Sequence, residues 1–148
     1  MSVTGNPKQS CESLTVGDER EQVVVEKLGR TQIVQYAGAS GDFNPIHHDE
    51  TFATGAAGYP SVFAHGMLTM GLTGRLLTDW LGDGVLREFG LRFVSQVWPG
   101  DTLTAKGTVS AIEREGDRGR VQIDLVTTNQ RGEPVVKGSA VAVLPARR

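Results

Sequence analysis

The most apolar stretch of the chain runs from Gly66 to Leu81 and is hydrophobic on nearly every side. Arg75 and Asp79 interrupt it, and it is shorter than the ~20 apolar residues that a bilayer span requires. A helix with so wide an apolar surface is expected to be enclosed by the rest of the fold. The pattern therefore predicts a buried central helix. Its internal glycines, which cost ~1 kcal/mol each against alanine, indicate close packing.

Strand-like alternation dominates the sequence after this helix. Four runs favour strands, at residues 85–97, 102–113, 120–129 and 134–144. Phe89, Leu91 and Phe93 alternate with polar or small residues, as one buried face of a strand requires. Before the central helix, residues 22–28 favour a strand and residues 31–40 a short amphipathic helix. This order predicts an α+β fold in which an antiparallel sheet curls around one helix.

Polar and irregular segments complete the pattern. Residues 1–12 lack hydrophobic periodicity and are expected to form a flexible N-terminal tail, followed by a single domain over residues 13–148. Residues 42–60 contain several glycines and prolines. They are therefore expected to form an irregular overhang with one helical turn at residues 49–53.

Composition and charge narrow the class of protein. At 148 residues with 39% hydrophobic residues, the chain has enough apolar material for one ordinary core. The net charge of −2 argues against a nucleic-acid-binding module, whose affinity depends on neutralising phosphates. The single cysteine, Cys11, leaves no internal disulfide, and the first residues show no secretion signal pattern, so a reducing cytoplasm is the expected compartment.

Arginines gather in the second half of the chain, where basic residues outnumber acidic ones. Arg114, Arg118, Arg120 and Arg131 are interpreted as charges at loop ends that keep the protein in solution. The alternative is that they help to bind a phosphorylated coenzyme or an acidic carrier protein.

A Gly-rich, Pro-interrupted turn carries the strongest chemical signal. Within residues 36–47, Asp42 and His47 lie five positions apart. The helix breakers in this segment allow the chain to curl so that the two side chains meet. A facing carboxylate and imidazole can hold one water molecule, remove a proton from it and return a proton elsewhere. The alternative is that Asp42 only braces the turn through a hydrogen bond to the backbone.

Two motifs together resemble the MaoC-like hydratase/dehydratase family. The first reads Tyr-Ala-Gly-Ala-Ser-Gly-Asp-Phe-Asn-Pro-Ile-His at residues 36–47, and the second is the His-Gly-Met sequence at residues 65–67 that starts the central helix. The resemblance covers roughly residues 14–144 and is strongest to a carrier-protein dehydratase subunit of fatty-acid synthesis. It implies a hot-dog fold, which is the α+β layout predicted above.

The resemblance also implies an activity and its residues. The expected reaction is the reversible hydration of trans-2-enoyl thioesters, or the dehydration of (3R)-3-hydroxyacyl thioesters, on coenzyme A or acyl carrier protein, without a cofactor or metal. Asp42 and His47 are the expected catalytic pair, and the backbone N–H of Gly66 is the expected donor to the thioester oxygen. The candidate substrate-binding residues are Tyr36, Phe43, Asn44, His65 and Met67.

Several alternatives accompany this interpretation. A metal site formed by His47, His48, Asp49 and His65 lacks the usual ligand spacing. The chain could instead be a non-catalytic subunit that shapes an acyl tunnel, or a hot-dog thioesterase that also uses a carboxylate and a helix N-terminus. Gly74 stands where some relatives carry a serine, so the length of the acyl chain is left open.

An assembly of two chains is expected. A curled sheet around one helix leaves a strand edge exposed, and edge-to-edge pairing covers it. A homodimer is the first expectation, and a heterodimer with a related hot-dog subunit is the second.

Overall fold

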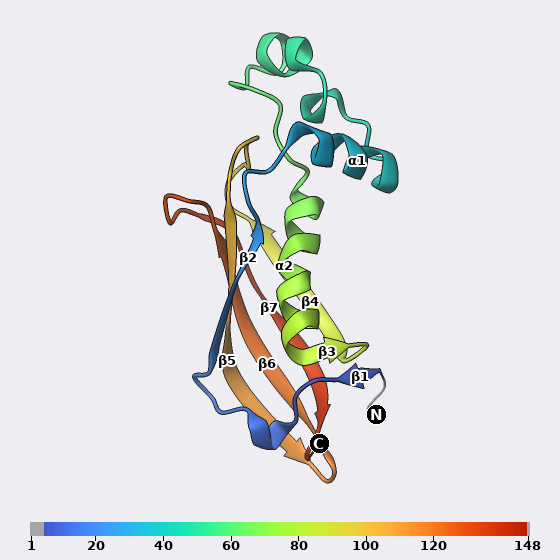
Figure 1. Ribbon diagram of the computed structural model, residues 1–148, viewed down its shortest axis with the longest axis vertical. Coiled ribbons are helices and arrows are strands. Elements are labelled where there is room, and N and C mark those ends of the chain that lie inside the picture. Colours follow the sequence, from blue (N-terminus) through green and yellow to red (C-terminus); the bar gives the residue numbers. More distant parts are fainter. Residues whose placement is uncertain (1–4, 148) are drawn as a thin grey trace.

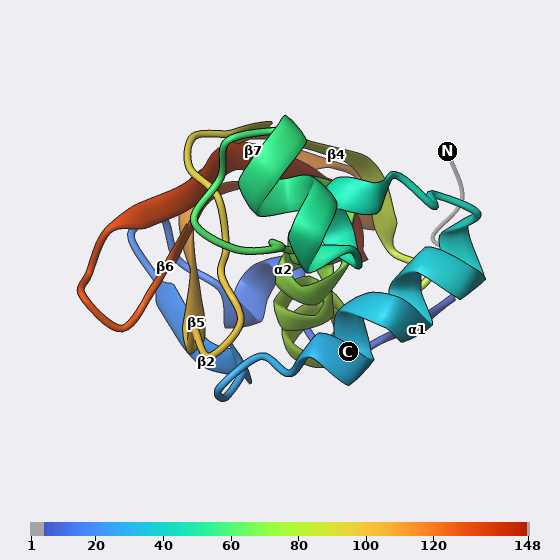
Figure 2. The same cartoon turned by 90° about the horizontal axis from the view of Figure 1, so that it is seen from above.

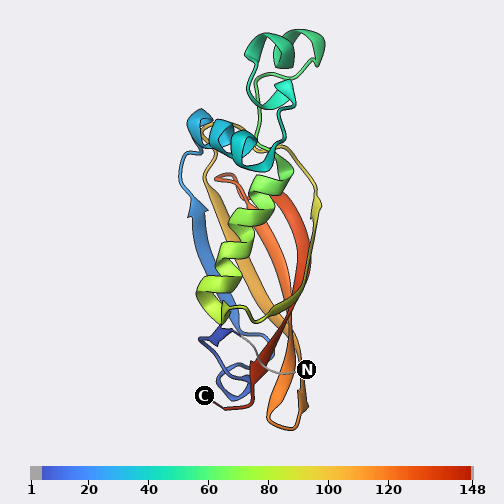
Figure 3. The same cartoon turned by 90° about the vertical axis from the view of Figure 1, so that its right-hand side faces the viewer.

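The computed structural model describes residues 5–147, and its centre is a curved antiparallel sheet wrapped around one long helix (Figure 1). The sheet has five strands in the order β2-β5-β6-β7-β4. Their bounds are Glu19–Val25 for β2, Leu86–Phe93 for β4, Leu103–Glu115 for β5, Arg118–Thr128 for β6 and Pro134–Pro145 for β7. The central helix α2, Gly66–Leu81, lies on the concave side of the sheet (Figure 3). This confirms the predicted α+β hot-dog arrangement.

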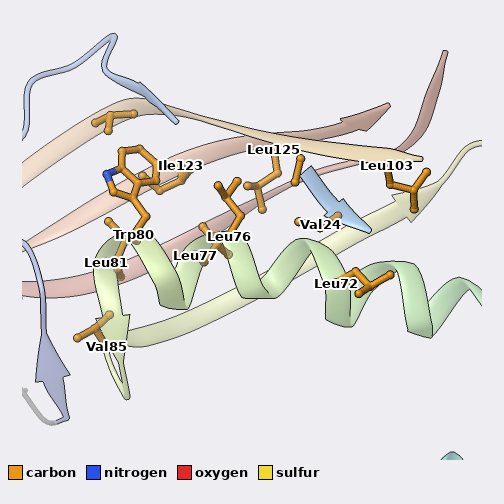
Figure 4. Packing of buried hydrophobic residues seen from close by; sticks show 14 of the residues in the cluster. Val24, Leu72, Leu76, Leu77, Trp80, Leu81, Val85, Leu103, Ile123 and Leu125 are labelled. Atoms are coloured by element: carbon orange, nitrogen blue, oxygen red, sulfur yellow. The ribbon is translucent and has the colours of Figure 1, made fainter. Parts of the chain in front are cut away.

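The hydrophobic core lies between α2 and the inner face of the sheet (Figure 4). Its largest fully buried side chains include Leu76, Leu77 and Leu81 of the helix and Leu103 and Ile123 of the sheet. Trp80 of the helix packs over Gly107 of β5, where an added Cβ would lie 3.2 Å from the indole ring. A glycine at this strand position therefore lets the helix approach the sheet closely.

One stripe of α2 is exposed, which corrects the expectation of a helix enclosed on nearly every side. Met67, Gly71, Arg75 and Asp79 recur at every fourth position along this stripe. Asp79 accepts a hydrogen bond of 2.8 Å from Gln22 of the edge strand β2. An added Cβ at Gly71 would meet open space, so close packing does not explain this glycine. Within residues 5–147, no helix is long and apolar enough to cross a bilayer.

Residues 5–12 are packed onto the fold, which corrects the flexible tail expected over residues 1–12. Strand β1, Asn6–Pro7, pairs antiparallel with β3, Gly82–Asp83. Cys11 begins a short 3₁₀ helix and is completely buried. A few isolated apolar residues anchor this segment, and such a small number gives no periodicity that a sequence pattern could reveal. Residues 1–4 lie outside the described part of the chain.

The long strands follow the prediction in number and differ in extent. β2 begins at Glu19 rather than at residue 22, and β4 ends at Phe93 rather than at residue 97. Beyond β4 the chain leaves the sheet, and the Val97 carbonyl accepts a hydrogen bond of 2.8 Å from the N–H of Ala64, just before α2. This contact joins the loop at residues 94–97 to the start of the central helix.

The overhang projects from one end of the sheet, next to the start of α2 (Figures 1 and 2). α1, Arg30–Ser40, leads into it, and the overhang itself contains a 3₁₀ turn, Pro45–His47, and a short helix, Phe52–Ala56. The helical turn expected at residues 49–53 is present, with the N–H of Ala53 bonded to the Asp49 carbonyl at 2.8 Å, and it continues to Ala56. The 3₁₀ turn before it was not expected. Gly41 ends α1 with a φ of 76°, a left-handed conformation that glycine adopts without strain. The reversal at Gly41 carries the chain directly into the Asp42–His47 segment.

Candidate active site

Asp42 and His47 face each other in the overhang, as the sequence predicts. Asp42 Oδ2 lies 3.9 Å from His47 Nε2. The imidazole is buried, with 8% of its side chain exposed, whereas the carboxylate side chain is 51% exposed. The separation is too long for a direct hydrogen bond, but one water molecule about 2.8 Å from each atom would bridge the two groups.

Hydrogen bonds within the turn explain how the chain brings the two side chains together. Asp42 Oδ1 accepts a hydrogen bond of 3.1 Å from the N–H of Asn44, and Asn44 Oδ1 accepts one of 3.2 Å from the N–H of Ile46. Pro45 begins the 3₁₀ turn, where its missing N–H leaves no bond unmade. One oxygen of Asp42 thus braces the turn while the other faces His47, so the bracing role and a catalytic role are compatible.

The proton arrangement of His47 follows from its contacts. Its Nδ1 lies 2.7 Å from the carbonyl oxygen of Phe63, and a carbonyl only accepts, so Nδ1 carries the hydrogen. In the neutral ring, Nε2 then presents a free lone pair on the side of Asp42. Burial lowers the pKa of His47 and the neighbouring His65 acts in the same direction, while the hydrogen bond to Phe63 and the charge of Asp42 oppose the shift. The net effect favours the neutral ring, which can accept a proton.

His65 contacts both residues of the pair. Its Nε2 lies 3.0 Å from the backbone carbonyl oxygen of Asp42, so Nε2 donates this hydrogen bond. Its ring stacks on that of His47 with the centroids 3.8 Å apart, and Tyr36 meets it edge-on at 4.9 Å. His65 is 2% exposed, and its Nδ1 has no hydrogen-bond partner among the described residues. The geometry favours a positioning role for His65 over the substrate contact expected from the sequence.

Gly66 is the first residue of α2, with His65 at the N-cap contributing no side-chain hydrogen bond. Its N–H is one of the groups at a helix start that have no partner within the helix and carry the positive end of the dipole. The ring of Phe93 lies against Gly66, because an added Cβ would be only 2.9 Å from it. Glycine therefore allows close packing here. An oxygen that gains negative charge beside this N–H would be stabilised.

A groove of about 280 Å³ opens beside Gly66. Its lining is mostly apolar and includes Phe63, Thr69, Phe93, Val97 and Val136. It lies between the start of α2 and the loop at residues 94–97. Ligand sites in proteins have this character, with apolar walls and a few polar groups.

The remaining candidate substrate-binding residues do not line the groove. Tyr36 contacts His65, and Asn44 caps the 3₁₀ turn. Phe43 and Met67 have exposed side chains. Their substrate contacts therefore stay predictions.

The sequence interpretation did not identify two residues of the site as functional. Phe63 accepts the hydrogen bond of His47 through its backbone, which no side-chain pattern reveals. The alternation of Phe93 with Leu91 does mark an inner-face position, but nothing in the sequence indicates that its ring covers Gly66.

Gly74 faces β4, at the position where some relatives carry a serine. An added Cβ at Gly74 would lie 3.2 Å from the ring of Phe89. A serine would therefore require Phe89 to shift, and the aromatic ring accounts for the glycine in physical terms.

Three residues have a spacing that suits a cation. Asp42, His47 and His65 offer ligand atoms within 4.8 Å of one another, the one such group found between residues 5 and 147. His48, part of the metal alternative from the sequence, is directed elsewhere, with Nε2 3.0 Å from the Phe43 carbonyl oxygen. The two stacked imidazoles each have one nitrogen hydrogen-bonded to a backbone carbonyl, which leaves the other nitrogen of each ring without such a bond.

Three of the four arginines considered for phosphate binding lie away from this site. Arg114, Arg118 and Arg120 line a pocket at the β5–β6 hairpin, at the end of the sheet opposite to the overhang (Figure 1). Arg131 is paired with Glu133 at 3.1 Å. Their placement favours the interpretation as solubilising charges.

Comparison with known proteins gives one consistent result. Residues 11–131 match the MaoC like domain. The (R)-specific enoyl-CoA hydratase of Aeromonas caviae is 33% identical over 138 residues, which cover 92% of this chain and 99% of that protein. A further curated relative, 46% identical over 68 residues, is longer, and the match covers 44% of this chain and 23% of that protein.

Solved structures share the fold. R-Hydratase PhaJ1 from Pseudomonas aeruginosa, in the unliganded form, has a TM-score of 0.79 at 27% identity and covers 94% of this chain and 86% of that chain. The ChsH1-ChsH2 complex from Mycobacterium tuberculosis contains a chain with a TM-score of 0.69 at 28% identity, covering 88% of this chain and 98% of that chain. Both similarities extend over most of this chain.

Proposed function

Because the chain belongs to the MaoC-like dehydratase family, we propose that it is a hydro-lyase that adds water reversibly to trans-2-enoyl thioesters, which is equivalent to dehydrating (3R)-3-hydroxyacyl thioesters. The name of the Aeromonas relative supports the reaction and its stereochemistry. The observation that carries the proposal is the facing pair of Asp42 Oδ2 and His47 Nε2, 3.9 Å apart at the end of the sheet where α2 begins. Thioesters of coenzyme A and of acyl carrier protein are the proposed substrates, in fatty-acid metabolism.

Water addition uses the pair as base and then as acid. His47 Nε2 accepts a proton from the water that it holds with Asp42, and the resulting hydroxide bonds to C3 of the enoyl group. The electrons of the C2=C3 bond move toward the thioester carbonyl, whose oxygen becomes negative and accepts a hydrogen bond from the N–H of Gly66. His47 then returns the proton to C2. The same steps in reverse order give dehydration.

The acyl part of the substrate is assigned to the apolar groove beside Gly66. A thioester carbonyl at the Gly66 N–H would place its neighbouring atoms against Phe93 and Val97, which line the groove. Apolar contacts of this kind hold an acyl chain without fixing its chemistry.

A dimer is the proposed assembly. β4 is at one edge of the sheet, so its outer backbone groups are available to pair with a second copy. The ChsH1-ChsH2 complex combines two differently named chains. A heterodimer with a related chain is therefore the alternative to a homodimer. The buried free thiol of Cys11 fits the reducing cytoplasm proposed as the compartment.

Incubating the purified chain with crotonyl-coenzyme A tests the reaction. Loss of the enoyl absorbance without thiol release is the expected result and identifies a hydratase. Thiol release would instead identify a thioesterase. If the enoyl absorbance and the thiol content stay unchanged both with the chain alone and with a related partner chain present, catalysis by Asp42 and His47 is contradicted. That result would support a non-catalytic subunit.

A further inference from the structure

Two cations face each other on the sheet without an acidic partner. Arg92 of β4 and Lys137 of β7 are directly opposite in the strand register, and both side chains are exposed. Neither takes part in an ion pair with any residue of the described chain. Like charges directly opposite on neighbouring strands repel each other. An anion between them would remove this repulsion.

Strand alternation places both cations on the outer face of the sheet. Phe93, next to Arg92, packs inward against Gly66, so Arg92 points to the other side. Val136, next to Lys137, lines the inner groove, so Lys137 also points outward. On the outer face the two residues line a shallow groove.

The charge is concentrated at the β4–β7 end of this row. Lys137 is opposite Val126 of β6, which is opposite Lys106 of β5, so the three cations share one row across the sheet. Lys106 is neutralised by Glu19, whose Oε1 lies 2.9 Å from its Nζ. Asp124 is only diagonal to Lys137 in the register and forms no ion pair with it. Arg92 and Lys137 are therefore the uncompensated pair.

The outer groove adjoins the proposed active site. Val94 lines both this groove and the one beside Gly66. β4 is an edge strand and ends at Phe93, so a ligand can pass around the strand end from the inner groove to the outer one. Edge-to-edge pairing of β4 would use its backbone groups and leave the outer face open.

We propose that Arg92 and Lys137 bind the phosphate at the far end of the pantetheine arm of the acyl thioester. The proposal rests on the proposed function, which makes the ligand a pantetheine thioester with its carbonyl at Gly66. A phosphate can accept hydrogen bonds from a guanidinium and an ammonium group together, and each such charged contact is strong. Coenzyme A and acyl carrier protein both carry this phosphate. The pair therefore selects phosphorylated carriers, independently of the acyl chain.

The test compares crotonyl-coenzyme A, crotonyl-carrier protein and crotonyl-pantetheine, which lacks the phosphate, as substrates of the parent and of R92A/K137A. For a phosphorylated substrate, we expect kcat/KM of the double variant to fall about tenfold or more, because KM rises. The ratio of kcat/KM for that substrate to kcat/KM for crotonyl-pantetheine should fall by the same factor. A fall for one phosphorylated substrate alone identifies the carrier in use. The control Lys106→Ala, on the same row but already paired, should keep the parent ratio. An unchanged ratio in the double variant overturns the proposal.

A binding measurement separates this proposal from the proposed function. Calorimetry with coenzyme A and with pantetheine needs no turnover. The parent should bind coenzyme A more tightly, and R92A/K137A should lose that preference while its melting temperature stays at or above the parent value. Equal affinity of parent and double variant for coenzyme A would overturn the phosphate site even in an active hydratase. Absence of turnover in a parent that shows the preference would overturn the proposed function alone.

Discussion

A single backbone carbonyl decides which nitrogen of His47 can act as a base. Phe63 accepts the hydrogen of Nδ1, so the lone pair of the neutral ring is on Nε2, opposite Asp42. The second oxygen of Asp42 is occupied by the N–H of Asn44, which fixes the carboxylate in the turn. Each contact orients a reacting group before any substrate binds.

The pKa of His47 should lie below the ordinary value of about 6.5, because burial disfavours the charged ring. The unfolded chain then binds this proton more readily than the folded one. The contribution of His47 to stability is therefore present above pH ~6.5 and is lost as the pH falls through its lower folded pKa. An NMR titration of the His47 ring measures it directly. Asp42→Asn should lower the pKa further, since the carboxylate raises it, and titration at or above 6.5 in the parent would contradict the account.

His65 can be tested by two substitutions that divide its contacts. His65→Phe keeps a ring beside His47 but removes the donor to the Asp42 carbonyl, and it also removes the buried unpaired Nδ1. We expect kcat/KM to fall about tenfold without a loss of melting temperature. His65→Gln restores an N–H donor and should recover most of the rate. Parent-like kinetics of the Phe variant would show that His65 does not position Asp42.

At the scale of elements, the start of α2 combines a free N–H with a backbone that already suits proline. His65 has φ −59° and ψ 135°, a conformation that a following proline accepts. Any side chain at position 66 would press on the ring of Phe93, which is half exposed. The steric effect and the loss of the N–H can therefore be separated.

Gly66→Ala and Gly66→Pro form the matched pair for this separation. Alanine adds a Cβ and keeps the N–H, so we expect a modest loss of kcat/KM. Proline adds a similar Cβ and removes the N–H, and its kcat should fall a further ~100-fold, as for other oxyanion donors. Both melting temperatures need to be measured beside the rates. If the two folded variants have the same kcat, the thioester oxygen is stabilised by another group.

Local sequence patterns predicted the elements whose residues decide their own conformation. The apolar run from Gly66 to Leu81 has the bounds of α2, and the helix breakers around Pro45 bring Asp42 toward His47. These signals act over a few residues, so the sequence carries them directly.

Features that depend on distant partners could not be predicted in this way. The position of Phe93 over Gly66 and the burial of Cys11 arise only when the sheet closes around the helix. The opposition of Arg92 and Lys137 depends on the register of two strands that are far apart in the sequence. Tertiary packing, rather than local preference, decides all three.

At the scale of the whole molecule, a single chain leaves the backbone groups at the edges of the sheet without a neighbouring strand. The last residue of β4, Phe93, and the next residue, Val94, have exposed apolar side chains, whereas the β2 edge begins with charged residues that discourage pairing. We therefore expect pairing through the outer backbone groups of β4.

Light scattering at micromolar concentration should give the mass of a dimer. Val94→Glu places a charge at the β4 edge without disturbing the monomer, because this side chain is exposed, and should shift the protein toward monomer. The control Val23→Glu makes the same change at an exposed side chain on the β2 edge and should leave the dimer intact. A monodisperse parent monomer would contradict the assembly.

The central claim is that Asp42 and His47 act together on one water molecule. Substitutions that preserve the structural contacts of these two residues can test it. Asp42→Asn keeps the oxygen that accepts from Asn44, and His47→Asn keeps an N–H near the Phe63 carbonyl. Each removes the capacity to transfer a proton. The melting temperatures of both variants should therefore remain close to that of the parent.

The decisive measurement is kcat/KM for crotonyl-coenzyme A hydration by these two variants and by the double variant, beside their melting temperatures. We predict a loss of ~100-fold or more for each single change. The double variant should be little worse than the poorer single one, because groups that act as a unit are not additive. Parent-like rates in a folded Asp42→Asn or His47→Asn variant would remove that residue from the mechanism and contradict the account.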